Sequence, residues 1–279
     1  MSAFVFFLLL AAALFHASWN IIVKSGANKL FEIGLNSLGG FVGAICILPF
    51  TEFPGLNCIP MLFISCITHL AYYFSMAVTY KLADLSVAYP VMRGSAPIFT
   101  ALCLTLLGHP LPSNGWLAIL LLCAGILSLS GEQFFSANRQ FKGILFALFS
   151  AIIIMGYTIA DGFGARLSQS SLSYTAWMYI INMIPLQLLI LLKHKAAYLP
   201  YMKKRLLPGI FGGICGICSY GIALWAMTKT SIALVSALRE TSVIFGIILA
   251  VIFLHERLGF LRLIAILLVT AGAISIRLA

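Results

Sequence analysis

The sequence predicts an all-α integral membrane protein in which ten transmembrane helices form two inverted five-helix repeats. Three observations lead to this fold class. The 279-residue chain is 62% hydrophobic and only 9% charged, whereas a soluble domain carries about 25% charged residues. Its apolar runs are long and continuous, without the period-two alternation of a membrane β-barrel. Finally, a set of residues in the first half recurs in the same order in the second half.

A helix needs about 20 apolar residues to cross the hydrocarbon core of a bilayer. The predicted spans are roughly Ala3–Val23, Phe31–Phe50, Met61–Tyr80, Leu85–Leu107, Trp116–Ser130, Gly143–Ala160, Tyr174–Leu192, Leu207–Met227, Ser231–Leu254 and Leu261–Ile276. Their connections are short and leave no room for a soluble catalytic domain. The first span lacks a preceding basic stretch and is followed by further spans, so we interpret it as a membrane helix and not as a cleavable signal peptide.

The net charge of +10 does not indicate nucleic-acid binding, because the basic residues are spread over short loops between apolar segments. Most of them follow the odd-numbered segments: Lys24, Lys29, Lys81, Arg139, Lys142, Lys193, Lys195, Lys203, Lys204, Arg205, Arg257 and Arg262. Arg166, Lys229 and Arg277 lie on the other side. By the positive-inside rule, the odd-numbered loops are cytoplasmic and both termini are outside. The expected location is a bacterial inner membrane.

The internal repeat is anchored on Arg93 and Arg239. Around this pair the following residues correspond: Ile98-Phe99 with Ile244-Phe245, His109 with His255, Ala124-Gly125 with Ala271-Gly272, and Trp19-Asn20 with Tyr157-Thr158. The chain therefore divides into two units, residues 1–135 and 140–279. An odd number of spans in each unit gives the units opposite orientations in the membrane, an arrangement common in secondary transporters that bind substrate near the midplane.

Arg93 and Arg239 are the strongest candidate site residues. A charge at the centre of a membrane helix costs about 2.5–3.5 kcal/mol even on lenient insertion scales, so it faces a partner or a wet cavity. Two arginines at repeat-related positions predict a central site for a carboxylate, phosphate or phosphonate, which the planar guanidinium group binds well. The structural alternative is that these arginines pair with Glu240 or with helix carbonyls.

Further candidates for the substrate site follow from these two arginines. Glu240 is either their counter-ion or a proton-coupling carboxylate. Tyr89 lies four residues before Arg93, on the same helix face. Asn20 is expected to face protein or cavity, with a hydrogen bond between helices as the common alternative. Trp19, Tyr73 and Tyr220 are candidate cavity walls, although aromatic residues near helix ends are often interfacial anchors.

Several other residues favour structural roles. Asp161 follows the sixth predicted span, and we expect it to make a helix-end or loop interaction. His69 is expected to be a hydrogen-bonded structural histidine. Cys215 and Cys218 form a CxxC pair, but inside a membrane helix they are expected to be packing residues, and no other spacing indicates a metal site. No catalytic motif is present, so we predict neither an enzyme nor a bound cofactor.

The chain resembles the drug/metabolite transporter superfamily, in particular its EamA-type ten-helix members. The resemblance covers nearly the whole length and rests on these stretches: His16-Ala-Ser-Trp-Asn20, Ala83-Asp-Leu-Ser-Val-Ala-Tyr-Pro90, Arg93-Gly-Ser-Ala-Pro97, Ser219-Tyr-Gly-Ile-Ala-Leu-Trp-Ala226 and Ile252-Phe-Leu-His-Glu-Arg-Leu258. The opening His-Ala-Ser-Trp-Asn and the stretch Tyr89-Pro-Val-Met-Arg-Gly94 are similar to a phosphonate-utilisation-associated subgroup. The family usually ends the fourth helix with Gly-Glu, where this chain has Gly108-His109 and keeps the acid only as Glu256 in the second half.

Together these features predict a secondary transporter that moves a small polar, anionic metabolite by alternating access at a cavity between the repeats. Proton or ion coupling and a monomeric or homodimeric state remain open. The alternatives are a flippase for a phosphate-headed lipid carrier and an exporter of amino acids or drug-like compounds. An intramembrane enzyme or a sensor is disfavoured, because the sequence shows neither a catalytic constellation nor a signalling domain.

Overall fold

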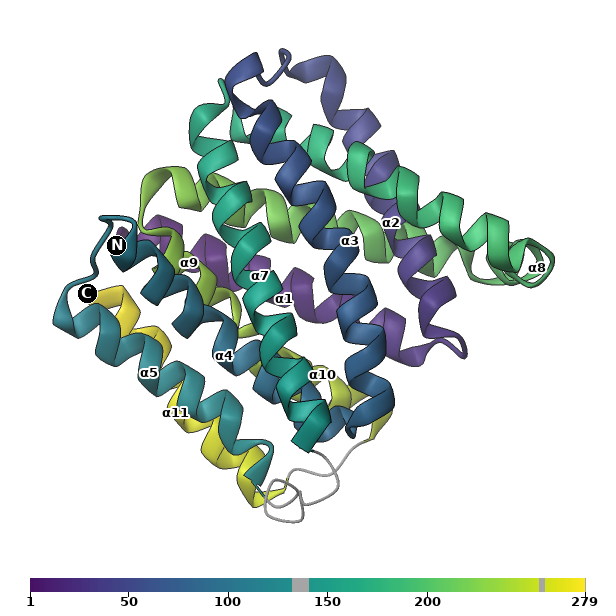
Figure 1. Cartoon of the computed structure of the whole chain (residues 1–279). Coiled ribbons are helices and arrows are strands. Elements are labelled where there is room, and N and C mark those ends of the chain that lie inside the picture. The colour runs from purple at the N-terminus through teal and green to yellow at the C-terminus, as the bar shows by residue number, and fades with distance from the viewer. Residues whose placement is uncertain (132–140, 256–258, 279) are drawn as a thin grey trace.

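The computed structural model describes residues 1–131, 141–255 and 259–278, and within these ranges the chain forms helices and no strands (Figure 1). The α-helices are α1 (Ala3–Ser25), α2 (Lys29–Ile47), α3 (Ile59–Leu82), α4 (Leu85–Leu106), α5 (Ser113–Ser128), α7 (Phe141–Leu167), α8 (Ser171–Lys229), α9 (Ile232–Arg239), α10 (Ser242–Leu254) and α11 (Phe260–Leu278). Two short 3-10 helices, η1 (Leu48–Phe50) and η2 (Leu56–Cys58), join α2 to α3. In the described chain, eight helical stretches are long and apolar enough to cross a membrane, and α5 is a shorter apolar helix.

Helix α8 is a helical hairpin. A straight helix of 59 residues would be about 90 Å long, far more than the roughly 30 Å hydrocarbon core of a bilayer. The helical geometry breaks at His194, where φ is −134° and ψ is 18°. Both arms then pack against α2: its Gly34 faces Ile190 and Tyr198, one on each side of the break. The two predicted spans of this region are therefore the arms, and the predicted linker Lys193–Arg205 is helical apart from His194.

The predicted span Ser231–Leu254 is two helices, α9 and α10. They meet at Glu240 and Thr241, whose backbone amides bond to the carbonyls of Ala237 and Leu238 at 2.9 and 3.1 Å. These bonds span three residues and tighten the turn, so the axis is interrupted beside Arg239. By contrast α4 runs through Pro90 and Pro97 as one helix. The ten-span plan with inverted repeats stays a prediction.

The loops gather at two opposite ends of the bundle. At one end Ser173 donates to the carbonyl of Glu52, the amide of Gln169 donates to Pro54, and Arg166 donates to the carbonyl of Thr230. Both chain termini lie together near this end (Figure 1), where Arg277 donates to the carbonyl of Met1 at 2.7 Å. The bend of α8 lies at the other end. This arrangement matches the predicted separation of basic and less basic loops.

Small residues let the helices approach closely. The contact between α5 and α11 is reciprocal: a Cβ on Gly125 would lie 2.8 Å from Leu268, and one on Gly272 would lie 2.7 Å from Leu122. Such close contacts are typical of membrane helices, which gain little from hydrophobic burial against one another in lipid. Large apolar side chains such as Phe7, Phe63 and Phe149 instead stay exposed on the outside of the bundle, as expected for a surface in contact with lipid.

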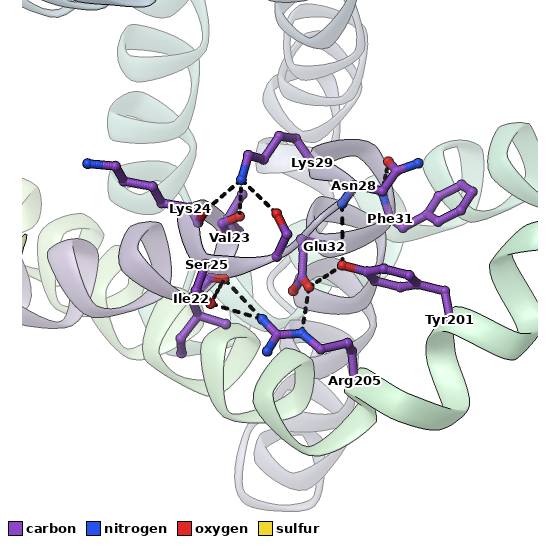
Figure 2. A network of polar contacts seen from close by, with 11 residues as sticks. Ile22, Val23, Lys24, Ser25, Asn28, Lys29, Phe31, Glu32, Tyr201 and Arg205 are labelled. Atoms are coloured by element: carbon purple, nitrogen blue, oxygen red, sulfur yellow. Dashed lines mark hydrogen bonds and ion pairs between the residues drawn. The ribbon is translucent and has the colours of Figure 1, made fainter. Parts of the chain in front are cut away.

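A polar network joins α1, α2 and α8 at the basic end (Figure 2). The buried carboxylate of Glu32 accepts from Arg205 Nε at 2.7 Å and from the hydroxyl of Tyr201. Arg205 also donates to the carbonyl of Ile22 and to the hydroxyl of Ser25. The side chain of Glu32 lies where a Cβ on Gly26 would stand, so a residue without a side chain is required there. This network ties the end of α1 to the second arm of α8.

Some sequence predictions fall outside the described residues. They concern the boundary between the two units near residues 135–140, the loop residues Arg139 and Arg257, and the family-like acid Glu256.

The network around Glu32 predicts a measurable contribution to stability. Arg205→Met removes the guanidinium group and leaves the Glu32 carboxylate buried without its cation, which we expect to lower the free energy of unfolding by about 3 kcal/mol. Thermal unfolding in detergent measures the loss. Lys204→Met is the matched control, since Lys204 is exposed on the same helix. Equal stability of the two variants would contradict this role for the network.

Candidate functional site

Arg93 lies in the middle of α4 and is buried, with 6% of its surface exposed. Its Nε atom forms an ion pair of 2.9 Å with Oε2 of Glu240, at the junction of α9 and α10. Neither of these two atoms is aligned for a hydrogen bond, so the contact is mainly electrostatic. Nη2 of Arg93 lies 3.3 Å from Nε2 of His16 on α1. The arginine thus connects the first helix of the chain to the interrupted helix of the second half.

Trp19 and Asn20 support His16 from the same helix. Nε1 of Trp19 donates to Nδ1 of His16 at 3.3 Å. Trp19 Nε1 and Arg93 Nη2 are both donors, and a neutral imidazole accepts at only one of its two nitrogens, so His16 can accept from one of these neighbours at a time. The amide of Asn20 donates to the carbonyl of His16 at 2.7 Å, so it is engaged within α1. Of Trp19 and Asn20, it is Trp19 whose side chain contacts the imidazole ring of His16, which lies next to Arg93.

Arg239 is buried but has no acidic partner among the described residues. Its exposed fraction is 9%, and its guanidinium carbon lies 4.6 Å from the centre of the Tyr220 ring on the second arm of α8. Its Nε is buried without a hydrogen-bond partner. Glu240, its neighbour in sequence, pairs with Arg93 instead. The two repeat-related arginines therefore differ, because one is neutralised directly and the other is not.

A second buried carboxylate, that of Asp161, lies next to the hydroxyl of Tyr220. Asp161 is fully buried in α7 and accepts from the hydroxyls of Tyr174 at 3.0 Å and Tyr220 at 2.6 Å. The ring of Tyr174 crosses α7 at Gly164, where a Cβ would collide with it. The expectation that Asp161 makes a helix-end or loop interaction was wrong. The helix continues to Leu167, so Asp161 lies inside it and faces the bundle.

The remaining aromatic candidates are placed differently. His69 stacks on Tyr157 with ring centres 4.3 Å apart, and its Nδ1 lies 2.9 Å from the carbonyl of Ser65, which fits the predicted structural role. Tyr89 is half-buried and packs against the apolar cluster between α4 and α7. Tyr73 packs against the cluster between α2 and α8. Tyr89 lies close enough to Arg93 on the same helix for their side chains to interact, whereas no contact of Tyr73 with either arginine is found in the described chain.

Two cavities lie away from the arginines. One of about 260 Å³ is apolar and lies between α1, α10 and α11, with Thr241 and Phe245 in its wall. The other, of about 390 Å³, is polar and lies at the loop between α7 and α8, where Arg166 and Lys229 line it. No group of three or more metal-binding side chains occurs in the part of the chain that the structure describes. Both arginines are thus enclosed by protein in this conformation.

The buried charges of the site nearly balance. Arg93 and Glu240 neutralise each other directly, and Tyr220 contacts Arg239 with the face of its ring and Asp161 with its hydroxyl. A guanidinium group without a carboxylate partner, held in a dry site, is suited to bind an anion through a planar fork of donors. This arrangement can bind and release a charged solute. In the described residues it contains no nucleophile paired with a base of the kind that acyl or phosphoryl transfer requires.

Comparison with known proteins gives the class of the protein. Residues 141–278 match the model of the EamA-like transporter family. This match supports a place for the chain in the drug/metabolite transporter superfamily, and the apolar helices of the described chain agree with an integral, multi-pass membrane protein of the transporter class. A crystal structure titled only as that of a protein aligns with a TM-score of 0.79, at 21% identity, over 100% of this chain and 98% of its own. At that identity the likeness shows a shared fold. No curated protein matches the chain.

The site residues whose contacts the sequence did not predict are Asp161 and Tyr174. The signal for Asp161 was an acidic residue followed by Gly162-Phe163-Gly164, which is still apolar and can continue a membrane helix. Tyr174 carries no such signal, because its partner lies on another helix.

The pairing of Arg93 with Glu240 predicts strong coupling in stability. Glu240→Leu leaves a buried, unpaired arginine and is expected to lower the free energy of unfolding by about 3–5 kcal/mol. The double variant Arg93→Leu/Glu240→Leu is expected to recover most of this loss, because no uncompensated charge remains. Unfolding of the two single variants and the double variant in detergent gives the coupling energy. Strictly additive losses would show that the two side chains do not interact.

Proposed function

We propose that this protein is a secondary transporter of a small polar anion, and that Arg239 is the group that binds the anion's negative charge. The observation that carries the proposal is a buried guanidinium group with a free Nε and no acidic partner among the described residues. An unpaired buried charge is costly, and its retention inside a membrane indicates a function. The Arg93–Glu240 pair adjoins this group, since Glu240 follows Arg239 in the chain, and the ring of Tyr220 contacts the Arg239 guanidinium.

The alternating-access mechanism is supported by signs of internal symmetry. Gly125 contacts Leu268 and Gly272 contacts Leu122, which are the contacts expected if a twofold axis exchanged α5 and α11. In the same way, α3 packs on α7 and the second arm of α8 packs on α1. The family match spans residues 141–278, which is nearly the second predicted unit, 140–279. Rocking of two such units about the arginines exposes the site to each side of the membrane in turn.

A second candidate function is favoured by the apolar cavity between α1, α10 and α11. Thr241 lies in its wall, next in sequence to Glu240. A phosphate-headed lipid can therefore place its head near the arginines and an acyl chain in this cavity, as a flippase requires. In the described chain, no comparable feature favours an exporter of amino acids or drug-like compounds.

The orientation that we propose follows the basic end of the bundle. Lys24, Lys81 and Arg205 belong to that end, so it is cytoplasmic in a bacterial inner membrane and both termini are outside. A C-terminal fusion to a fluorescent protein that matures only in the cytoplasm is then expected to be dark, and a fusion to a periplasmic phosphatase to be active. The reverse pattern contradicts the orientation.

A thermal-shift screen tests the role of Arg239. The purified protein in detergent is mixed with small carboxylates, amino acids, inorganic phosphate, phosphorylated compounds and phosphonates. One anion class is expected to raise the apparent free energy of unfolding by about 2.7 kcal/mol at a hundredfold excess over Kd.

Arg239→Gln is expected to abolish this stabilisation, whereas Lys229→Gln, which changes an exposed cation at the end of α8, preserves it. Stabilisation only by cations or neutral compounds, or unchanged stabilisation in Arg239→Gln, would exclude Arg239 as the anion-binding group.

A further inference from the structure

Asp161 and Arg239 contact the same aromatic residue, Tyr220, one at its hydroxyl and the other over the face of its ring. The hydroxyl of Tyr220 donates to Asp161 Oδ2 at 2.6 Å, and the face of the same ring contacts the guanidinium group of Arg239. Asp161 has no exposed surface, and Tyr174, its other partner, has none either. No cation contacts the carboxylate directly in the described chain. Tyr220 is the contact that Asp161 and Arg239 share.

The site is electrically neutral as a whole. Two guanidinium groups, Arg93 and Arg239, face two carboxylates, Glu240 and Asp161. When a monoanion binds Arg239, the enclosed site carries one negative charge too many. Burying an uncompensated charge in a site of low polarity is unfavourable. A proton taken up together with the anion removes this charge.

Asp161 is better placed than Glu240 to accept that proton. Glu240 lies 2.9 Å from Arg93 and keeps its cation when an anion occupies Arg239. In contrast, when an anion binds Arg239, the positive charge of this arginine no longer offsets the negative charge of Asp161. The hydroxyl hydrogens of Tyr174 and Tyr220 can rotate, so a protonated Asp161 can donate to one phenol oxygen while it accepts from the other. The network stays satisfied in both protonation states.

The other titratable groups around Asp161 do not offer an alternative acceptor at this position. The elements packed against α7 present Cys58 from η2, His69 from α3, Arg93 from α4, Tyr174 and Tyr220 from α8, and Arg239 from α9. Tyr157 of α7 itself and Tyr179 of α8 also lie near enough to interact electrostatically with Asp161. His69 stacks on Tyr157 and is bound to the carbonyl of Ser65, and its ring meets Tyr220 edge-on at 6.3 Å. Among these groups in the described chain, only Tyr174 and Tyr220 are hydrogen-bonded to Asp161.

From this geometry we infer that Asp161 is a proton-binding site that couples anion transport to proton transport. The inference rests on the proposed function of Arg239. The negative charge of the bound anion offsets the positive charge of Arg239. Asp161 then takes up a proton from the same side of the membrane, which converts its carboxylate to the carboxylic acid. The anion and the proton leave together on the other side. For a monoanion, each cycle then moves one anion and one proton, with no net charge.

Transport in proteoliposomes tests this inference. The probe is radiolabelled L-lactate, or radiolabelled inorganic phosphate if only phosphate-type anions stabilise the protein. With wild type, a pH gradient of about one unit, acidic outside, is expected to concentrate lactate up to about tenfold, the limit for one proton per anion. A membrane potential alone is expected to have no effect on lactate uptake.

Asp161→Asn separates coupling from binding. In this variant the bound anion itself neutralises Arg239, so exchange of internal for external anion persists while accumulation driven by the pH gradient is lost. Glu52→Gln, an equivalent change at an exposed loop residue, is expected to retain both activities. Accumulation by Asp161→Asn equal to that of wild type overturns the inference and leaves the proposed function intact. Absence of anion exchange in wild type overturns both.

A measurement on wild type covers the case in which Asp161→Asn fails to fold. Calorimetric titration of lactate in two buffers of different ionisation enthalpy gives the number of protons taken up per bound anion. Uptake of about one proton supports the inference, because rotation of the tyrosine hydroxyls lets the site accept it without an unsatisfied group. Uptake of none contradicts it while leaving anion binding established.

Discussion

The need to balance charges inside an apolar bundle governs the arrangement of the central helices. Arg93, Arg239, Glu240 and Asp161 are all buried, and each is costly in a bilayer unless another group compensates it. The ion pair of Arg93 with Glu240 holds α4 beside the interruption between α9 and α10. Tyr220 and Tyr174 bring both arms of α8 onto Asp161 of α7. Elements far apart in sequence thus converge on one site.

Close helix packing makes this convergence feasible. Gly164 leaves space for the ring of Tyr174, while Gly125 and Gly272 let α5 and α11 meet along their length. These glycines matter for packing, because a Cβ at each position would collide with a neighbouring helix. The interruption at Glu240 has a different effect: it ends α9 just after Arg239, so the unpaired cation and the paired carboxylate lie in consecutive positions with different partners. This asymmetry between repeat-related arginines is what gives the site a free positive charge.

Much of the helical architecture follows from the sequence, because long apolar runs have only one stable form in a bilayer. The two arginines could be singled out for the same reason, since a charge in such a run requires a partner. The ends of the helices were predicted less accurately than the helices themselves. Ending the sixth span at Ala160 placed Asp161 at the helix end, although Gly162 and Phe163 continue the helix. Contacts such as that of Tyr174 with Asp161 depend on how helices pack, and hydrophobic periodicity does not determine them. Tyr73 was selected as a candidate cavity wall, but packing places it against α2 and α8.

An experimental structure in lipid nanodiscs, determined with and without the anion that stabilises the protein most, tests the central claim directly. With the anion present, density is expected within hydrogen-bonding distance of the Arg239 guanidinium group, while Arg93 keeps its ion pair with Glu240. Without the anion, Arg239 is expected to contact Tyr220 and no carboxylate. Anion density remote from Arg239, or an ion pair between Arg239 and a protein carboxylate in the absence of the anion, would contradict the account.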